Sequence, residues 1–401
     1  MTDTPPQRLP GTVHLLAVCQ ALMMSSNTLM VTAAALVGFS LADDKSLSTL
    51  PLALQFLATM LTSIPAAMLL ARIGRKPGFM LATLLSIGGG SLAVIAIQAH
   101  QFWWFCGAAV LLGMFNAFGT YYRFAAADIV SVENKARAIS AVMIGGVIAA
   151  FVGPNLANLG QGLIADARFA GSFMFVIGMG LLSMLALSFT HYTGQVVEHP
   201  VGAGRRLPEI AAQPRFVVAV LCAMLGYAVM SFIMTATPLA MDHHHHHFSD
   251  TAFVIQWHVL GMFAPSFVTG RLIKRFGVER LLWTGALLLV GTLLINLLGT
   301  TLWHFWTALV LLGIGWNFLF IGGTTMLTET YRPEERAKTQ ALNDFLVFTS
   351  TTLASLSAGA MLHGFGWWWV NIGVIPLVLV IIASLSWLGL RGHRQPTGAS
   401  A

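Results

Sequence analysis

Charged residues and cysteines are scarce in this sequence, and each shortage excludes a class of protein. Asp, Glu, Lys and Arg form only 9% of the 401 residues, against 56% hydrophobic residues. A soluble domain carries about 25% charged residues, because its whole surface faces water. The three cysteines, Cys19, Cys106 and Cys222, lie singly in apolar stretches, without the paired spacing of disulfides or zinc sites. The composition therefore predicts an integral membrane protein.

Long apolar runs predict twelve transmembrane helices. A helix needs about 20 apolar residues to cross the hydrocarbon core, whereas a strand of a membrane barrel needs only about 10 alternating ones. The expected fold class is an all-α polytopic membrane protein, because a spanning helix satisfies its own backbone hydrogen bonds. No short apolar region with a small-residue cleavage site opens the sequence, so no signal peptide is expected. The predicted spans are 13–41, 48–71, 78–98, 102–127, 137–160, 168–190, 216–241, 251–271, 280–299, 303–327, 337–362 and 367–390.

The basic residues predict how these spans are oriented. With twelve spans both chain ends face the same side, and all 21 Lys and Arg residues except Lys45, Arg123 and Arg168 fall on that side. An excess of Lys and Arg is typical of cytoplasmic loops. We therefore expect a multi-pass protein of the cell inner (plasma) membrane with both termini in the cytoplasm. The net charge of +6 is explained by these loops, without a nucleic-acid partner.

The two halves of the chain carry related sequences. Residues 128–138 align without gaps on 329–339, and the same offset places Asn116 on Asn317. Duplicated six-helix halves are typical of transporters, with the substrate path near the membrane midplane. The predicted domains are an N-terminal half at 1–190, a cytoplasmic linker at 191–215 and a C-terminal half with a short cytoplasmic tail at 216–401.

A loop motif after the second span carries a resemblance to the major facilitator superfamily. The loop pattern of that family reads G-x-x-x-D-R-x-G-R-K, and residues 67–76 here read AMLLARIGRK. Ala71 and Lys274 stand where the two halves of the family carry an acid. Gly153 and Pro154 match part of a G-x-x-x-G-P-x-x-G-G pattern that is frequent in exporters of this family. The matching positions of the loop motif are Arg72, Gly74, Arg75, Lys76, Arg275 and Gly277.

The resemblance covers essentially the whole chain. It implies two pseudo-symmetric six-helix bundles that alternate between inward-facing and outward-facing states. It also implies that the first, fourth, seventh and tenth helices line a central cavity. The missing acids leave the family's charge relay at the cytoplasmic gate without its usual residues.

The expected function is secondary transport of a small organic solute rather than enzymatic catalysis. The sequence has no P-loop, HExxH motif or nucleophile elbow, so it predicts no ATPase or hydrolase chemistry and no cofactor. A gradient, most plausibly of protons, must then supply the energy. Proton-coupled efflux of a drug or metabolite by a monomeric antiporter is the first choice. The alternatives are an uptake permease for a vitamin-like nutrient or metal chelate, and a membrane receptor or scaffold that does not transport.

Polar and aromatic residues within the spans are candidates for the substrate cavity. Two mid-span amides among aromatic rings suit a planar or amphipathic solute, held by stacking and a few hydrogen bonds. The alternative is interhelical hydrogen bonding without substrate contact. The cavity candidates are Asn116, Asn317, Phe115, Trp316, Gln20 and Asn27.

Three ionisable residues within spans are candidates for gating or proton coupling, because charge in a membrane is costly and so suggests function. Arg123 and Asp344 lie near the cytoplasmic ends of the fourth and eleventh spans and are expected to pair across the halves. His258, in the eighth span, could exchange protons near neutral pH. The alternatives are snorkelling for Arg123, local hydrogen bonding for Asp344 and packing for His258.

A histidine run lies in the predicted outer loop between the seventh and eighth spans. Consecutive imidazoles can capture zinc, nickel or copper. The alternative is a solvated loop that binds metal only adventitiously, and we expect no metal in the transport function. The run consists of His243, His244, His245, His246 and His247.

Overall fold

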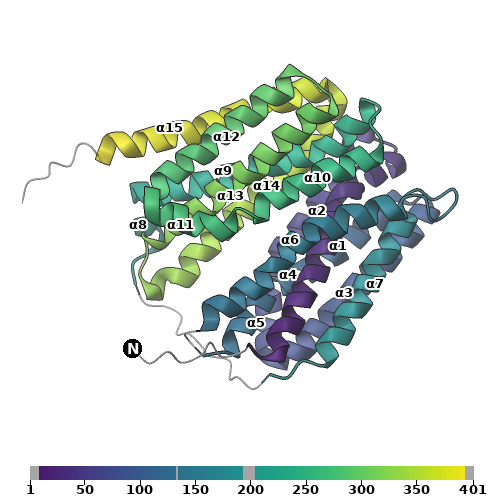
Figure 1. Ribbon diagram of the computed structural model, residues 1–401, viewed down its shortest axis with the longest axis horizontal. Coiled ribbons are helices and arrows are strands. Elements are labelled where there is room, and N and C mark those ends of the chain that lie inside the picture. The colour runs from purple at the N-terminus through teal and green to yellow at the C-terminus, as the bar shows by residue number, and fades with distance from the viewer. Residues whose placement is uncertain (1–8, 132–133, 193–203, 393–401) are drawn as a thin grey trace, which may run out of the picture. The chain divides into compact units, whose positions relative to one another are not determined.

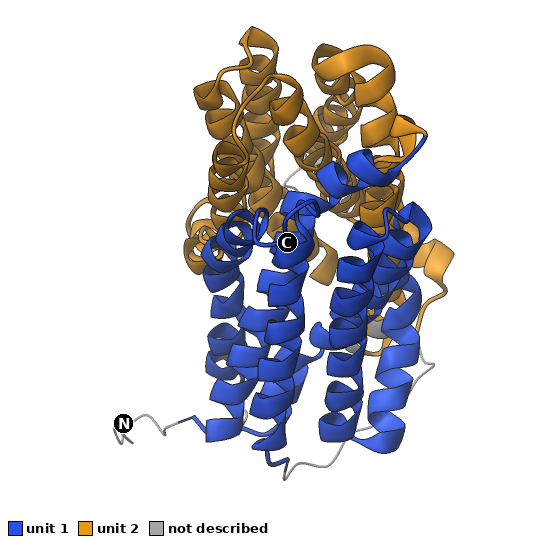
Figure 2. Cartoon of the chain, turned by 90° about the vertical axis from the view of Figure 1, so that its right-hand side faces the viewer, with its two compact units in different colours: residues 1–43, 54–198 blue, residues 44–53, 199–401 orange. Residues whose placement is uncertain are grey.

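The computed structural model describes residues 9–131, 134–192 and 204–392, and every regular element in those ranges is a helix (Figure 1). The chain divides into two compact units, residues 1–43 with 54–198 and residues 44–53 with 199–401 (Figure 2). The all-α fold predicted from the apolar runs is confirmed.

Unit 1 is built around a helix that is apolar on all sides. α1 packs against α4, α6 and α7, and α3 packs against α4 and α7. A helix that is hydrophobic all round has to be buried, and α1 is buried along most of its length. The helices of this part of the chain are α1 (Gly11–Leu41), α2 (Leu50–Ile73), α3 (Arg75–Gln98), α4 (Phe102–Gly119), α5 (Tyr122–Asp128), α6 (Lys135–Gly160) and α7 (Ala170–Ser188).

Glycines of α6 allow its close approach to α1. A Cβ atom at Gly145 would lie 2.7 Å from the backbone nitrogen of Ala21, and one at Gly153 would lie 2.7 Å from the Ser25 carbonyl and closer still to the Thr28 hydroxyl. Such small residues let helix backbones come together in membranes. The exporter-like glycine Gly153 therefore has a packing role inside unit 1.

Gly153→Ala is expected to destabilise unit 1, because the added methyl group meets backbone and a buried hydroxyl that cannot move aside. Overpacking of this kind costs about 1–3 kcal/mol. The measurement is the melting temperature of the purified protein. Gly88→Ala is the matched control, since a Cβ atom there meets nothing within 4 Å. A Gly153→Ala protein as stable as this control would contradict the packing role.

Unit 2 is organised around α9 and α13. α9 packs against α13 and α14, while α10 and α12 pack against α13. Its helices are α8 (Leu207–Ala211), α9 (Pro214–His243), α10 (Phe248–Phe263), α11 (Ser266–Phe276), α12 (Val278–Leu298), α13 (Leu302–Thr328), α14 (Arg336–Gly373) and α15 (Ile375–Gly392), with short 3-10 helices at Lys45–Leu47 and Pro333–Glu335.

Within the described ranges, ten helices are long and apolar enough to cross a membrane, or eleven if α10 and α11 form one span. The sequence predicts twelve, and the difference lies in a 54-residue stretch, 338–391, that counts once. Gly366, with φ 82° and ψ 177°, interrupts this stretch between the predicted spans 337–362 and 367–390. The positive φ suits glycine, which lacks the Cβ atom that would clash.

The predicted span 251–271 is also divided. α10 and α11 meet at Ala264 and Pro265 with a bend of 43°. Proline lacks the N–H for the helical hydrogen bond and its ring crowds the preceding turn, so it bends or ends a helix. The bend leaves backbone groups that other side chains must satisfy.

Residues 44–53, which comprise the connection after α1 and the first turn of α2, belong to unit 2. Thr49 Oγ1 donates to the Leu356 carbonyl of α14 at 3.4 Å and accepts the backbone N–H of Gly359 at 3.2 Å. A Cβ atom at Gly359 would lie 2.7 Å from Thr49 Oγ1. This segment is therefore held against α14 by hydrogen bonds as well as by close packing.

Candidate functional site

Three amide side chains from three helices meet inside unit 1. Asn27 of α1 accepts two hydrogen bonds at its Oδ1, from Gln55 Nε2 of α2 at 2.8 Å and from Asn116 Nδ2 of α4 at 3.1 Å. Asn27 and Asn116 are half-buried, whereas Gln55 is only 1% exposed. We call these three residues the amide cluster. Two of them are predicted cavity residues, and the structure brings them together.

The amide cluster keeps unused hydrogen-bonding capacity. An amide offers two donor hydrogens and two acceptor lone pairs, and Asn27 Oδ1 uses both of its lone pairs within the cluster. Within the described ranges, no hydrogen bond is recorded for Asn27 Nδ2 or Asn116 Oδ1, and the buried Gln55 Oε1 has no partner. The cluster can therefore both donate to and accept from a polar solute.

The other two cavity candidates of the first half lie outside this cluster. Phe115 is buried in the core of unit 1 with Phe79 and Tyr122, whose rings lie 4.7 Å apart. Gln20 is buried and its Cγ atom lies close to Gly145 of α6. Both side chains are buried against neighbouring helices, and their contact with the solute stays a prediction.

Asn317 in unit 2 has a different environment from its repeat partner Asn116. Asn317 is fully buried in α13, and its Nδ2 donates to the Met262 carbonyl at 2.6 Å and to Ser266 Oγ at 2.7 Å. Its Oδ1 accepts from Thr269 Oγ1 at 2.8 Å. These partners flank the bend between α10 and α11. Asn317 thus satisfies groups around the bend and has little capacity left for a solute.

Aromatic rings gather around Trp316 of α13. The Phe320 ring is stacked on it at 5.1 Å with an interplanar angle of 7°, and the rings of Tyr227 and Phe263 meet it edge-on at 5.2 and 6.3 Å. Tyr227 and Phe320 are half-buried, while Trp316 is buried. We call Tyr227, Phe263, Trp316 and Phe320 the aromatic cluster. Its half-buried rings offer flat apolar faces within unit 2.

The structure places the three gating candidates as follows. Arg123, in α5 of unit 1, is exposed and lies over the Phe124 ring at 4.8 Å. Asp344, in α14 of unit 2, is exposed and accepts from Asn343 Nδ2 at 3.1 Å. Their pairing stays a prediction. His258 is fully buried, with Nδ1 2.8 Å from the Leu309 carbonyl, and so connects α10 to α13.

The histidine run forms no metal centre in the described part of the chain, where no group of three His, Cys, Asp or Glu side chains is placed to hold an ion. His246 Nε2 lies 2.8 Å from the Thr300 carbonyl, and the rings of His243 and His244 meet edge-on at 5.5 Å. One imidazole is therefore engaged with backbone rather than with its neighbours.

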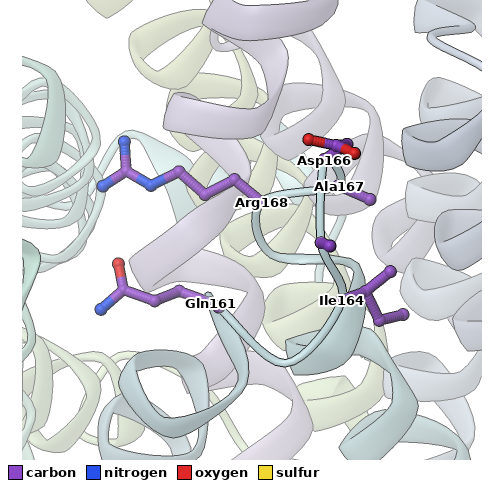
Figure 3. Close-up of a pocket in the computed structure, with 7 residues that line it drawn as sticks. Gln161, Ile164, Asp166, Ala167 and Arg168 are labelled. Atoms are coloured by element: carbon purple, nitrogen blue, oxygen red, sulfur yellow. The ribbon is translucent and has the colours of Figure 1, made fainter.

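A surface depression of about 570 Å³ lies in the loop between α6 and α7. It is lined by residues 161, 162 and 164–168, and the side chains of Gln161 and Arg168 extend to the same side of the loop (Figure 3). Asp166 and Arg168 are exposed. The depression lacks a buried polar group, and none of the predicted cavity residues lines it.

The loop motif joins helix ends within each unit. Gly74 and Gly277 have φ of 89° and 86° at the starts of α3 and α12, a conformation that favours glycine. Arg75 forms an ion pair of 2.5 Å with Asp128 at the end of α5. Lys76 donates to the Ser188 carbonyl at 2.6 Å.

In unit 2 the repeat counterpart of Asp128 is also paired. Glu329 binds Arg215 at 2.8 Å, and the same guanidinium lies 3.7 Å from Glu279. Of the remaining motif residues, Arg72 is exposed and Arg275 lies 5.1 Å above the Phe276 ring. Acids at the ends of α5 and α13 therefore form ion pairs although Ala71 and Lys274 have replaced the usual loop acids.

Comparison with known families agrees with the repeat, the motif and the fold. The model of the Major Facilitator Superfamily matches residues 16–254 and again 217–401. The chain belongs to the major facilitator superfamily. The resemblance seen in the loop motif is thereby confirmed.

The relatives of this superfamily member are transporters. The chain is 42% identical over 404 residues to the riboflavin transporter RfnT of Brucella anthropi, with 100% of both chains covered. It is 28% identical to YddS, an uncharacterised MFS-type transporter of Bacillus subtilis, over 89% of this chain and 86% of that one. The protein is therefore a multi-pass membrane transporter of a small molecule and not an enzyme, as the sequence predicts. Neither relative supports the predicted efflux or antiport.

A solved structure shares the fold. The D-xylose–proton symporter aligns with a TM-score of 0.71 at 13% identity, over 92% of this chain and 96% of that one.

Sequence reasoning missed Gln55 but found Asn27 and Asn116, the other two residues of the amide cluster. Gln55 lies in the second span, which the family resemblance does not place among the cavity-lining helices. The available signal was a lone amide in an otherwise apolar run, since polar groups in spans are costly unless they find partners.

Proposed function

We propose that this transporter carries riboflavin, or a flavin closely related to it, into the cell. The observation that carries this proposal is the 42% identity to a riboflavin transporter along the full length of both chains. The predicted alternative of vitamin uptake fits this relative better than drug efflux does.

The amide cluster supports a flavin as the solute. A flavin has a flat ring system with an apolar body and one edge where carbonyl oxygens flank a ring N–H. Asn27 Nδ2 can donate to such a carbonyl, and Asn116 Oδ1 can accept from a hydroxyl group of the solute. A few placed polar groups in an apolar surround are the usual means of orienting a small molecule.

The aromatic cluster supports the same solute class. Planar ring systems stack on aromatic faces, and such stacking contributes about 0.5–1.5 kcal/mol beyond the free energy gained by burying apolar surface. Tyr227 and Phe320 provide such faces in unit 2, because both rings are half-buried.

The orientation and coupling follow from charge and composition. Lys and Arg are concentrated in the loops on the side of the termini, which favours cytoplasmic ends. No nucleotide-binding motif is present, which leaves a gradient as the energy source. The proposal takes protons as the coupling ion and a monomer as the working unit. Uptake is the proposed direction, and Gly153, which resembles an exporter signature, is accounted for by packing against α1.

The proposal is tested in a riboflavin-auxotrophic bacterium that lacks its own carrier. Expression of this chain should restore growth at low external riboflavin, and labelled riboflavin should accumulate faster at acidic external pH. Unlabelled xylose should not compete. Growth that still requires the same high riboflavin concentration, with the protein present in the membrane, would overturn the proposal.

Asn116→Ala is expected to weaken riboflavin uptake without lowering the amount of protein in the membrane. Loss of one hydrogen bond to the solute raises the half-saturating concentration about threefold to tenfold. Asn155→Ala is the matched control, because Asn155 is an exposed amide on α6 that donates to the Phe151 carbonyl. Equal half-saturating concentrations in both variants would remove Asn116 from the solute site.

A further inference from the structure

Gln55 carries an acceptor atom that nothing in the described structure uses. Its side chain is 1% exposed, and Oε1 is buried without a hydrogen-bond partner, while Nε2 of the same amide donates to Asn27 at 2.8 Å. Buried polar groups without partners are rare in folded proteins, because each one costs free energy. An unused buried acceptor within a cluster of amides is a candidate contact for a ligand that donates a hydrogen bond.

The backbone around Gln55 is held in place by α4. Thr59 Oγ1 donates to the Gln55 carbonyl at 2.9 Å and lies 3.0 Å from the Gly113 carbonyl. A Cβ atom at Gly113 would collide with the Gln55 carbonyl and lie 2.8 Å from the Ala58 Cβ. The close contact of α2 with α4 and the bond to Asn27 together fix both ends of the Gln55 side chain.

We propose that Gln55 is a specificity-determining residue whose Oε1 accepts the ring N–H that lies between the two carbonyl groups of a flavin. This inference rests on the proposed transport of riboflavin and adds the feature of the solute that is recognised. Asn27 Nδ2, on the residue that Gln55 contacts, is placed to donate to an adjacent carbonyl. The N–H and one C=O of the same ring edge would thus each have a hydrogen-bond partner in the amide cluster.

This arrangement selects for solutes that carry an N–H at that edge. A site built to accept a hydrogen bond rejects analogues that lack the donor, because its own polar atom is then left buried and unpaired. A methyl group on the ring nitrogen removes the donor and adds bulk at the same point, whereas the rest of the flavin is unchanged. Gln55 would therefore distinguish riboflavin from its N3-methyl analogue.

The experiment compares riboflavin with N3-methylriboflavin in proteoliposomes that contain the full chain. The wild-type protein should take up riboflavin with a half-saturating concentration about tenfold to a hundredfold below that of the analogue. No riboflavin uptake at all would overturn the proposed function and this inference with it. Riboflavin uptake with equal use of the analogue would leave the proposed function intact and overturn the role of Gln55.

Substitution of Gln55 then assigns the discrimination to this residue. Gln55→Met keeps the length of the side chain and removes the acceptor, so both solutes should be used within about twofold of each other. Gln101→Met is the matched control, because Gln101 is exposed ahead of α4, and it should discriminate like the wild type. Gln55→Leu makes the same test if Gln55→Met does not reach the membrane. Discrimination that survives these substitutions would overturn the proposal, because another group would then recognise the N–H.

Discussion

Asn317→Ala is expected to lower the stability of the folded protein by about 2–4 kcal/mol. The substitution removes one hydrogen-bond partner each from the Met262 carbonyl, from Ser266 Oγ and from Thr269 Oγ1, all next to the bend between α10 and α11. Met262 and Thr269 are buried, so water cannot replace the lost amide at these two residues without cost. The measurement is the melting temperature of detergent-solubilised protein, together with its abundance in the membrane.

The repeat partner of Asn317 provides the comparison. Asn116→Ala should leave the melting temperature within about 2 °C of the wild type, because Asn116 makes one hydrogen bond and is half-buried. Two variants related by the internal repeat should thus differ, one in stability and the other in solute affinity. Equal melting temperatures for the two variants would contradict the structural role of Asn317.

Arg205→Gln is expected to cause the second large loss of stability, seen as a fall of roughly 5 °C in melting temperature. Glu335 is fully buried at the start of α14. It accepts from the Arg205 backbone N–H at 2.7 Å, from Nε at 3.0 Å and from Nη2 at 2.8 Å, and the Arg332 backbone N–H adds a bond of 3.0 Å. Without the guanidinium, a carboxylate remains buried with its main partner gone.

The pH dependence gives this prediction a sign. The hydrogen bonds from Arg205, and then that from the Arg332 backbone, hold the pKa of Glu335 below its ordinary value of 4.5. A lowered pKa contributes stability above the unfolded-state value, and this contribution is lost as the pH falls. The difference in melting temperature between wild type and Arg205→Gln should therefore be full at pH 7 and shrink below about pH 4.5.

A difference that is constant from pH 7 to pH 3 would contradict the ion pair as its source. Arg206→Gln is the control, because Arg206 is the neighbouring arginine and is exposed. Its melting temperature should stay close to that of the wild type at every pH.

The fold was predictable because it follows from composition and repetition, both of which are visible along the chain. Apolar runs of sufficient length and a duplicated motif specify two sets of spanning helices. The breaks were not predictable in the same way. Pro265 is visible as a helix breaker, yet the hydrogen bonds beside the 43° bend come from Asn317, which lies 52 positions away in the sequence.

The site was predictable only in part, because the role of an amide depends on the helices around it. Asn116 and Asn317 are equivalent in the aligned halves, but one has a half-buried face and the other is enclosed by the bent pair α10 and α11. Gln55 was missed for the converse reason. Its importance lies in the contact of α2 with α4 at Gly113, and no local pattern in the sequence reports that contact.

The most direct test of riboflavin transport is counterflow in proteoliposomes, because it requires carrier-mediated exchange and no assumed coupling ion. Vesicles preloaded with unlabelled riboflavin should show a transient overshoot of labelled riboflavin, which should be reduced by Asn116→Ala and unchanged by Asn155→Ala. Vesicles with correctly folded wild-type protein that show no overshoot above protein-free vesicles would contradict the account.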